Sequence, residues 1–317
     1  MFPRYFKVAQ RTFSTLPGTG KTVGFVGLGC MGIPMSRNLK DNGYNVKGFD
    51  LMPEARKSAN EAGIPTVDSL AECASDVDYV VTALPKTEHV EDALKCDGGI
   101  FASAKPGTLI CDTSTISPKG AAQFHQDAKQ VGLTYLDTPM SGGVTGARGA
   151  TLTFMVGGSA EEFEASKGVL VGMGKNFFHC GGPGTGEIAK LTNNLILGIS
   201  MVAASEGMAI GEKLGMDPVI LQKILAVSTA RNWCIDTYNP RPGVLENVPS
   251  ANNYEGGFAV GLIKKDMVLA LEAAHSADAR TDMLEKSLDY YVQLEKGGMG
   301  KKDFGYVFQY IMKNKNI

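Results

Sequence analysis

Six residues near the start of the chain combine glycines at a fixed spacing with apolar runs on either side. The apolar run at residues 22–26 leads directly into them, and the next apolar run closes at Asp50, 23 positions after the first glycine. The six residues are Gly27, Leu28, Gly29, Cys30, Met31 and Gly32. The order of strand, glycine turn, helix, second strand and carboxylate is the context that a dinucleotide site requires.

Each glycine of this turn has its own physical task. Gly27 permits the tight turn, Gly29 lets a pyrophosphate approach the backbone, and Gly32 lets the helix pack close to the strand. Free N–H groups at the start of that helix point at the phosphates, and Asp50 accepts hydrogen bonds from ribose hydroxyls. We therefore predict a dinucleotide as the cofactor; the alternative is a glycine-rich turn without a ligand.

A Ser-Gly-Gly sequence follows a later apolar run and offers a place for a small carboxylate. Its residues Ser141, Gly142 and Gly143 expose consecutive backbone N–H groups beside a hydroxyl, which is a good anion cradle. The alternative is a plain loop between two strands.

A lysine near the start of a predicted helix is the candidate acid/base. Lys190 lies about one turn beyond Gly184-Thr185-Gly186, where the helix dipole and burial at a domain junction both lower the pKa of an ammonium. Asn194 is four residues later and so shares its helix face. The pair is able to hold one substrate oxygen, with Lys190 transferring the proton. A solvated surface lysine is the alternative.

A third segment, Lys264-Lys265-Asp266, starts another predicted helix. From there Lys265 is able to reach back to the cofactor. The alternative is a solvent-exposed pair of lysines on the helix surface, which has the same composition.

Composition limits the classes of partner. The chain has 317 residues, enough for two domains, and a net charge of −2 that argues against nucleic acid. Six cysteines and four histidines are scattered without metal-ligand spacing, and no apolar run reaches the length of a transmembrane helix. We expect a small-molecule substrate, no metal and no membrane.

The N-terminal segment differs from the rest. Its first acidic residue is Asp41, and residues 1–20 mix basic, aromatic and hydroxyl side chains. This composition is typical of an organelle transit peptide; a cytosolic tail is the alternative.

The apolar pattern divides the remaining chain in two. Short apolar runs at 77–84, 108–112, 134–137 and 151–157 alternate with helical stretches up to residue 184. They predict an α/β fold with a Rossmann-like, doubly wound, mostly parallel sheet, whose ligands bind beyond the carboxyl ends of the strands. Because Leu84, Pro85, Thr115 and Asp137 lie at or just after strand ends, we expect them to face this cleft. Residues 185–317 predict an all-helical second domain, with helices at 187–214, 218–227, 261–277, 281–296 and 302–312 and an unusual loop at 239–254.

These motifs, in this order, resemble the β-hydroxyacid dehydrogenase family over residues 22–313. The matching signatures are the glycine turn, Asp137-x-x-x-Ser141-Gly142-Gly143, Gly184-x-Gly186-x-x-x-Lys190-x-x-x-Asn194 and Lys265-Asp266. More specific strings lie at 233–240, 248–258 and 302–304.

The resemblance implies a role for each matching residue. Lys190 would be the catalytic acid/base, and Ser141, Gly142, Gly143 and Asn194 would hold the substrate. The cofactor contacts would be Leu84, Pro85, Thr115, Lys265 and, where relatives carry asparagine, His89. Leu51 follows Asp50 in place of the basic residue of relatives that prefer NADP.

The implied activity is the NAD-dependent oxidation of 3-hydroxyisobutyrate to methylmalonate semialdehyde, a step of valine breakdown in the mitochondrial matrix. Residues 21–184 would bind NAD, and 185–317 would bind substrate and form a homo-oligomer. Two alternatives stay open. One is a related enzyme that acts on another short hydroxyacid or semialdehyde, such as a glyoxylate or succinate semialdehyde reductase. The other is a dehydrogenase-like scaffold that has lost catalysis and only binds partners. An intact Lys190 argues against the scaffold.

Overall fold

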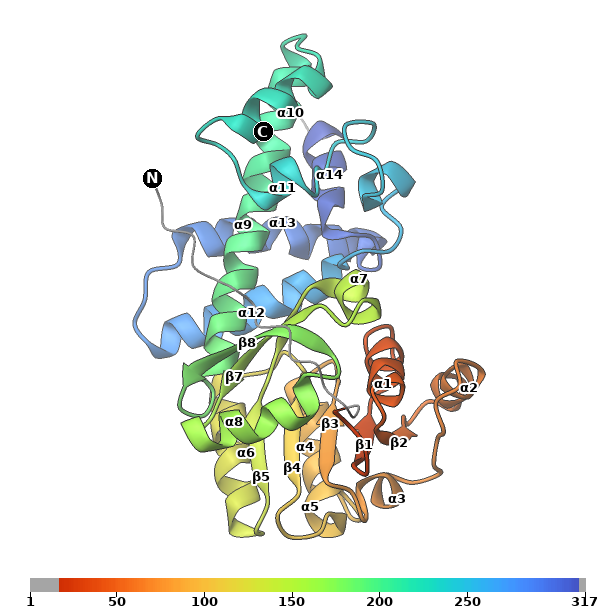
Figure 1. Cartoon of the computed structure of the whole chain (residues 1–317). Coiled ribbons are helices and arrows are strands. Elements are labelled where there is room, and N and C mark those ends of the chain that lie inside the picture. Colours follow the sequence, from red (N-terminus) through yellow and green to blue (C-terminus); the bar gives the residue numbers. More distant parts are fainter. Residues whose placement is uncertain (1–16, 314–317) are drawn as a thin grey trace, which may run out of the picture.

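An eight-stranded sheet with flanking helices forms the first part of the molecule, and helices form the second (Figure 1). The computed structural model describes residues 17–313. The strands are β1 (Thr22–Val26), β2 (Asn45–Phe49), β3 (Tyr79–Thr82), β4 (Leu109–Asp112), β5 (Thr134–Asp137), β6 (Met140–Ser141), β7 (Leu152–Gly157) and β8 (Gly174–Gly181). Their helices are α1 (Gly32–Asp41), α2 (Pro53–Glu61), α3 (Leu70–Ala74), α4 (Thr87–Lys95), α5 (Ile100–Ser103), α6 (Pro118–Gln130), α7 (Gly143–Arg148) and α8 (Ala160–Leu170).

The strand order places the ends of β1, β3 and β4 side by side. The order is β2-β1-β3-β4-β5-β7-β6, with β8 beside β7. The first five strands pair in parallel, whereas β7 runs antiparallel to β5 and β6. The chain winds from β1 outward to β2 and then crosses back to β3, so the order reverses beside β1. Ligands of open α/β sheets bind at such a point.

Alternating side chains along the strands fill two separate cores. Cys111 and Leu136 pack with Met35 of α1 on one face of the sheet. Ile110 and Tyr135, their neighbours in sequence, pack with the α4 and α6 side on the other face. This period of two on a sheet buried on both sides confirms the predicted doubly wound, mostly parallel fold.

The second part of the chain packs around one long helix, α9 (Thr185–Lys213), which rises out of the sheet domain (Figure 1). The other elements are α10 (Pro218–Val227), α11 (Trp233–Asp236), η1 (Pro249–Asn252), α12 (Val260–Ser276), α13 (Asp282–Leu294), η2 (Glu295–Met299), η3 (Phe304–Tyr306) and α14 (Val307–Lys313). Gly198 allows α9 and α12 to approach closely, because a Cβ there would lie 2.6 Å from the sulfur of Met267. The predicted all-helical second domain is confirmed.

Several local predictions need correction. The helix expected over 302–312 begins only at Phe304, because Asp303 is held in a β-bridge to Ala259. The short elements β6 and α11 were missed, and so was β8, whose largely exposed strand has no apolar run. The predicted transit peptide lies mostly outside the described residues.

The apolar content of α9 also exceeds the expectation from sequence. Within residues 17–313, α9 is the one helix long and apolar enough to span a membrane by length and composition. It packs against α10, α11, α12, α13 and α14, so much of its apolar surface faces the core of the second domain.

Candidate active site

The glycine turn leaves open space at one of its three glycines only. A Cβ at Gly27 would lie 2.4 Å from the carbonyl oxygen of Ala83, and one at Gly32 would lie 1.9 Å from that of Gly27. A Cβ at Gly29 would meet no atom within 4 Å. Gly27 also has φ +98°, which favours glycine. The turn is therefore tightly packed at Gly27 and Gly32 and open at Gly29, as a backbone cradle for pyrophosphate requires.

The charges around this turn suit NAD. The first turn of α1 has no acidic residue and no side-chain cap, so no carboxylate there would repel a phosphate at the start of the helix. Asp50 closes β2, and its carboxylate accepts hydrogen bonds from the N–H of Leu28 at 2.8 Å and of Met52 at 2.9 Å. A carboxylate fixed there can also accept hydrogen bonds from ribose hydroxyls. Of the remaining turn residues, Cys30 is exposed and Met31 half-buried. The residues present fit the cofactor.

The predicted contacts on the nicotinamide side follow the neighbouring strands β3 and β4. Leu84 donates its N–H to the hydroxyl of Ser114 at 2.8 Å, which ties the two strand ends together. Pro85 is exposed beside it, and so is His89 on α4. The carbonyl oxygen of Thr115 accepts a hydrogen bond from Nζ of Lys265 at 2.6 Å. That contact links the sheet domain to α12, as expected for a lysine that reaches back.

The Ser-Gly-Gly segment is more ordered than the expected turn. Ser141 belongs to β6 and pairs with Thr153 of β7. Gly142 (φ +134°) and Gly143 (φ +59°) then turn the chain into α7. Since α7 packs against α1, this segment lies on the side of the sheet that carries the glycine turn.

Lys190 is the sixth residue of α9 and is only 9% exposed. Among the residues that the structure describes, none forms a hydrogen bond or ion pair with its Nζ. Burial is the largest influence on the ammonium and lowers the pKa of Lys190. The carboxylates of Asp266 and Glu187 act in the opposite direction, and Lys265 lowers the pKa further. A buried amine that loses its proton readily can act as a base.

Asp266 organises the residues around Lys190. Its Oδ2 accepts a hydrogen bond of 2.6 Å from Nδ2 of Asn194, and its Oδ1 lies 3.0 Å from Nζ of Lys265 as an ion pair. Asn194 is thus held in place through one N–H, and the second N–H of its amide is able to bind a substrate oxygen. The sequence motif included Asp266, but the role of this carboxylate in fixing Asn194 was not predicted.

Two buried carboxyls, whose structural role was not predicted from the sequence, join the sheet to α9. Asp137, expected to face the ligand, is 1% exposed and accepts hydrogen bonds from the N–H of Gly184 at 2.8 Å and of Glu187 at 3.0 Å. That expectation was therefore wrong, since Asp137 caps α9. Glu187 is fully buried and accepts a hydrogen bond from the N–H of Ile116 at 3.2 Å. Their positions after Leu136 and before Lys190 were visible in the sequence, but their burial was not.

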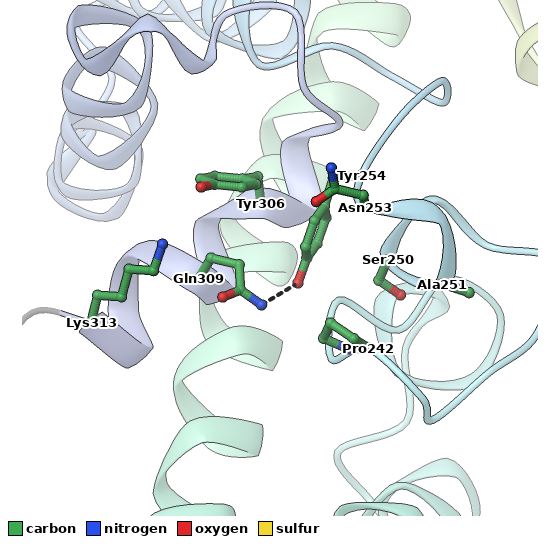
Figure 2. Close-up of a pocket in the computed structure, with 8 residues that line it drawn as sticks. All are labelled: Pro242, Ser250, Ala251, Asn253, Tyr254, Tyr306, Gln309 and Lys313. Atoms are coloured by element: carbon green, nitrogen blue, oxygen red, sulfur yellow. Dashed lines mark hydrogen bonds between the residues drawn. The ribbon is translucent and has the colours of Figure 1, made fainter.

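The unusual loop at 239–254 builds a pocket in the second domain. Figure 2 shows this pocket, whose volume is about 380 Å³, between the loop and α14. Tyr254 ties the loop to itself and to α14: it donates to the carbonyl of Pro240 at 2.7 Å and accepts from Gln309 of α14 at 3.2 Å. None of the predicted catalytic or cofactor residues lines it. Over residues 17–313, no group of histidine, cysteine or acidic side chains is arranged to hold a metal.

Comparisons with known proteins cover both parts of the chain. A family model described as the NAD binding domain of 6-phosphogluconate dehydrogenase matches residues 22–182. A second, described as NAD-binding of NADP-dependent 3-hydroxyisobutyrate dehydrogenase, matches residues 184–311.

Individual relatives agree with these matches. A protein of Dictyostelium discoideum named "Probable 3-hydroxyisobutyrate dehydrogenase, mitochondrial" is 44% identical, covering 93% of this chain and 92% of the relative. The NAD-dependent L-serine dehydrogenase of Pseudomonas aeruginosa is 41% identical, covering 90% and 96%. The solved structure of Mycobacterium tuberculosis 3-hydroxyisobutyrate dehydrogenase with L-serine superposes with a TM-score of 0.86 at 35% identity, covering 92% and 99%.

Proposed function

The chain belongs to the 3-hydroxyisobutyrate dehydrogenase family of NAD-dependent oxidoreductases, and on this basis we propose a substrate, a base and a compartment for it. The reaction is the oxidation of 3-hydroxyisobutyrate to methylmalonate semialdehyde. Lys190 is its acid/base, and the reaction serves valine breakdown. Residues 21–184 bind NAD, and residues 185–317 bind substrate and a second copy of the chain.

The observation that carries the proposal is the buried amine of Lys190 at the end of the sheet where the cofactor turn lies. Oxidation of an alcohol near neutral pH needs a group that takes the hydroxyl proton. An amine whose pKa is lowered by burial, beside an asparagine already fixed by Asp266, meets that need. An intact lysine at this position also argues against a scaffold without chemistry.

In the proposed mechanism each group has one task. Bound NAD supplies the acceptor for the hydride from the alcohol carbon. Nζ of Lys190 takes the hydroxyl proton, so that the O–H bond breaks while an N–H bond forms. The free N–H of Asn194 binds the same substrate oxygen, and the N–H groups of residues 141–143 hold the carboxylate. In the reverse direction the ammonium of Lys190 returns the proton.

L-Serine is the second candidate substrate, because a relative at 41% identity is named for it and the Mycobacterium tuberculosis relative is described together with it. Both molecules have a carboxylate and a terminal CH₂OH, and they differ in a methyl or an ammonium group between them. The shared groups are those that the proposed residues would bind, so the site as described accepts either.

A substrate panel tests the proposal. Purified enzyme with NAD is assayed for NADH formation with 3-hydroxyisobutyrate and L-serine, and with NADH for reduction of glyoxylate and succinate semialdehyde. We expect the highest kcat/KM with 3-hydroxyisobutyrate. A higher kcat/KM with any of the other three would replace the proposed substrate.

Localisation in the mitochondrial matrix is proposed from the acid-free N-terminus and the mitochondrial name of the Dictyostelium relative. N-terminal sequencing of the protein from its own cells tests it, with cleavage expected near residues 14–20. Retention of Met1 in a cytosolic protein would contradict the proposal.

A homo-oligomer is proposed from an exposed apolar face on α9 and α10. Its side chains are at least 47% exposed and include Ile196, Ile210, Leu214, Ile220, Ile224 and Val227. Exposed apolar side chains that gather on two packed helices are candidates for an interaction surface. Light scattering of the purified protein is expected to give a multiple of the chain mass, and Leu214→Glu is expected to reduce it. A monomer at all concentrations would exclude the oligomer.

A further inference from the structure

One buried carboxyl near the proposed base has no task in the mechanism above. Glu187 is the third residue of α9 and has no exposed surface. Its Oε2 accepts the N–H of Ile116 at 3.2 Å, whereas its Oε1 is buried and has no hydrogen-bond partner among the described residues. An unpartnered buried oxygen costs free energy, so its presence here calls for a physical reason.

Glu187 and Lys190 share one face of α9, because residues three apart are neighbours on a helix. The carboxylate of Glu187 favours the ammonium form of Lys190. Titratable groups of the adjoining elements surround the pair. They are Asp112 of β4, Tyr135 and Asp137 of β5, and Lys265 and Asp266 of α12.

Burial drives the two groups toward their neutral forms. It raises the pKa of Glu187 well above its usual value, and Asp112 and Asp137 raise it further. The same burial lowers the pKa of Lys190. Since opposite charges three residues apart on one helix attract each other, the protonation state of one group changes the proton affinity of the other.

We infer that Glu187 is a positioning residue for the reaction, which sets the proton affinity of Lys190 as the second member of a coupled buried pair. The inference rests on the proposed role of Lys190 as the base. When Lys190 takes the proton of the alcohol, the ammonium that forms favours the ionised form of Glu187, and the carboxylate of Glu187 in turn stabilises the ammonium. When the ammonium returns the proton in the reverse reaction, this stabilisation is lost.

The test is the pH dependence of the intact enzyme in both directions, with Glu187→Gln as the variant. Glutamine keeps an acceptor for the N–H of Ile116 but removes the charge. Without that charge the ammonium of Lys190 loses its proton at lower pH. Both the rising limb of kcat/KM for oxidation and the falling limb for reduction are then expected to move down by about one pH unit. Limbs that stay within 0.2 units, on the order of measurement error, would overturn the inference.

Glu206→Gln is the matched control. It removes one negative charge from the same helix, but Glu206 is exposed and its carboxylate accepts a hydrogen bond from Tyr290. The pH profile of this variant is expected to match that of the wild-type enzyme. A shift equal to that of Glu187→Gln would show a general charge effect and overturn the inference.

A second readout does not depend on turnover. In wild-type enzyme with ¹³C-labelled lysine, the side-chain signal that is lost in Lys190→Ala is followed against pH. A coupled pair gives a titration in two steps, whereas a single-step curve would overturn the inference. If Lys190→Ala keeps normal turnover, the proposed base is wrong; if turnover is lost but Lys190 titrates in one step, only the role of Glu187 is wrong.

Discussion

The cofactor turn at residues 27–32 and the junction around Lys190 are built from different parts of the polypeptide. The turn is formed by main-chain atoms, with no side chain at its three glycines. Its fit for NAD depends on close backbone contacts at Gly27 and Gly32 and on open space at Gly29. Charged side chains form the junction, and they come from α9, α12 and the ends of β4 and β5. The fit of the turn rests on fixed geometry, whereas the chemistry proposed for the junction rests on proton affinities that burial shifts.

The largest expected effect comes from removing the base. Lys190→Ala is expected to lower kcat by a factor of about 10² or more, or about 2.7 kcal/mol, because general-base catalysis is lost. NAD affinity is expected to stay within about threefold of wild type, since the turn does not involve Lys190. Steady-state kinetics and NAD titration measure the two effects. A folded, NAD-competent variant with kcat within about tenfold of wild type would remove Lys190 from the mechanism.

The turn can be tested with two substitutions of the same size. Gly29→Ala places a methyl group in open space, so stability is expected to stay within about 0.5–1 kcal/mol of wild type. NAD affinity is expected to fall at least tenfold, or about 1.4 kcal/mol, because the methyl group occupies the pyrophosphate position. Isothermal titration and thermal melts separate the two quantities.

Gly32→Ala is the matched variant for this experiment. Its methyl group would lie 1.9 Å from the carbonyl oxygen of Gly27, so the backbone has to shift. We expect a loss of about 1–3 kcal/mol in the free energy of unfolding. Equal losses of stability in the two variants would contradict the description of the turn as open only at Gly29.

The next effect concerns the choice of cofactor. Asp50→Asn is expected to weaken NAD by about tenfold, because a neutral amide replaces the charged acceptor of the ribose hydroxyls. NADP affinity is expected to change less or to rise, since a carboxylate repels a 2′-phosphate. Kd values for both cofactors decide the matter. A wild-type preference for NADP, or equal losses for the two cofactors, would show that Asp50 does not select NAD.

The same contrast explains how much of the molecule the sequence could predict. The turn, the sheet and α9 have local signatures: glycine spacing, apolar alternation and helical periodicity. The ordered positions of Asp137, Glu187 and Asp266 depend on tertiary packing, because similar acidic residues at other positions are exposed. Asp137 was misjudged for this reason: its place after an apolar run was correct, but the N–H groups that it caps belong to a segment 47 residues later.

The smallest expected effect concerns His89, whose cofactor role rests on correspondence with an asparagine in relatives. The side chain is exposed on the first turn of α4, beside the exposed Pro85. A hydrogen bond in contact with water contributes about 0.5–1.5 kcal/mol at most. His89→Ala is therefore expected to raise the KM for NAD by about two- to fivefold and to leave kcat unchanged, whereas His89→Asn is expected to restore the wild-type KM. A change in KM of more than about tenfold, or one that asparagine does not restore, would mean that His89 does more than provide one solvent-exposed contact.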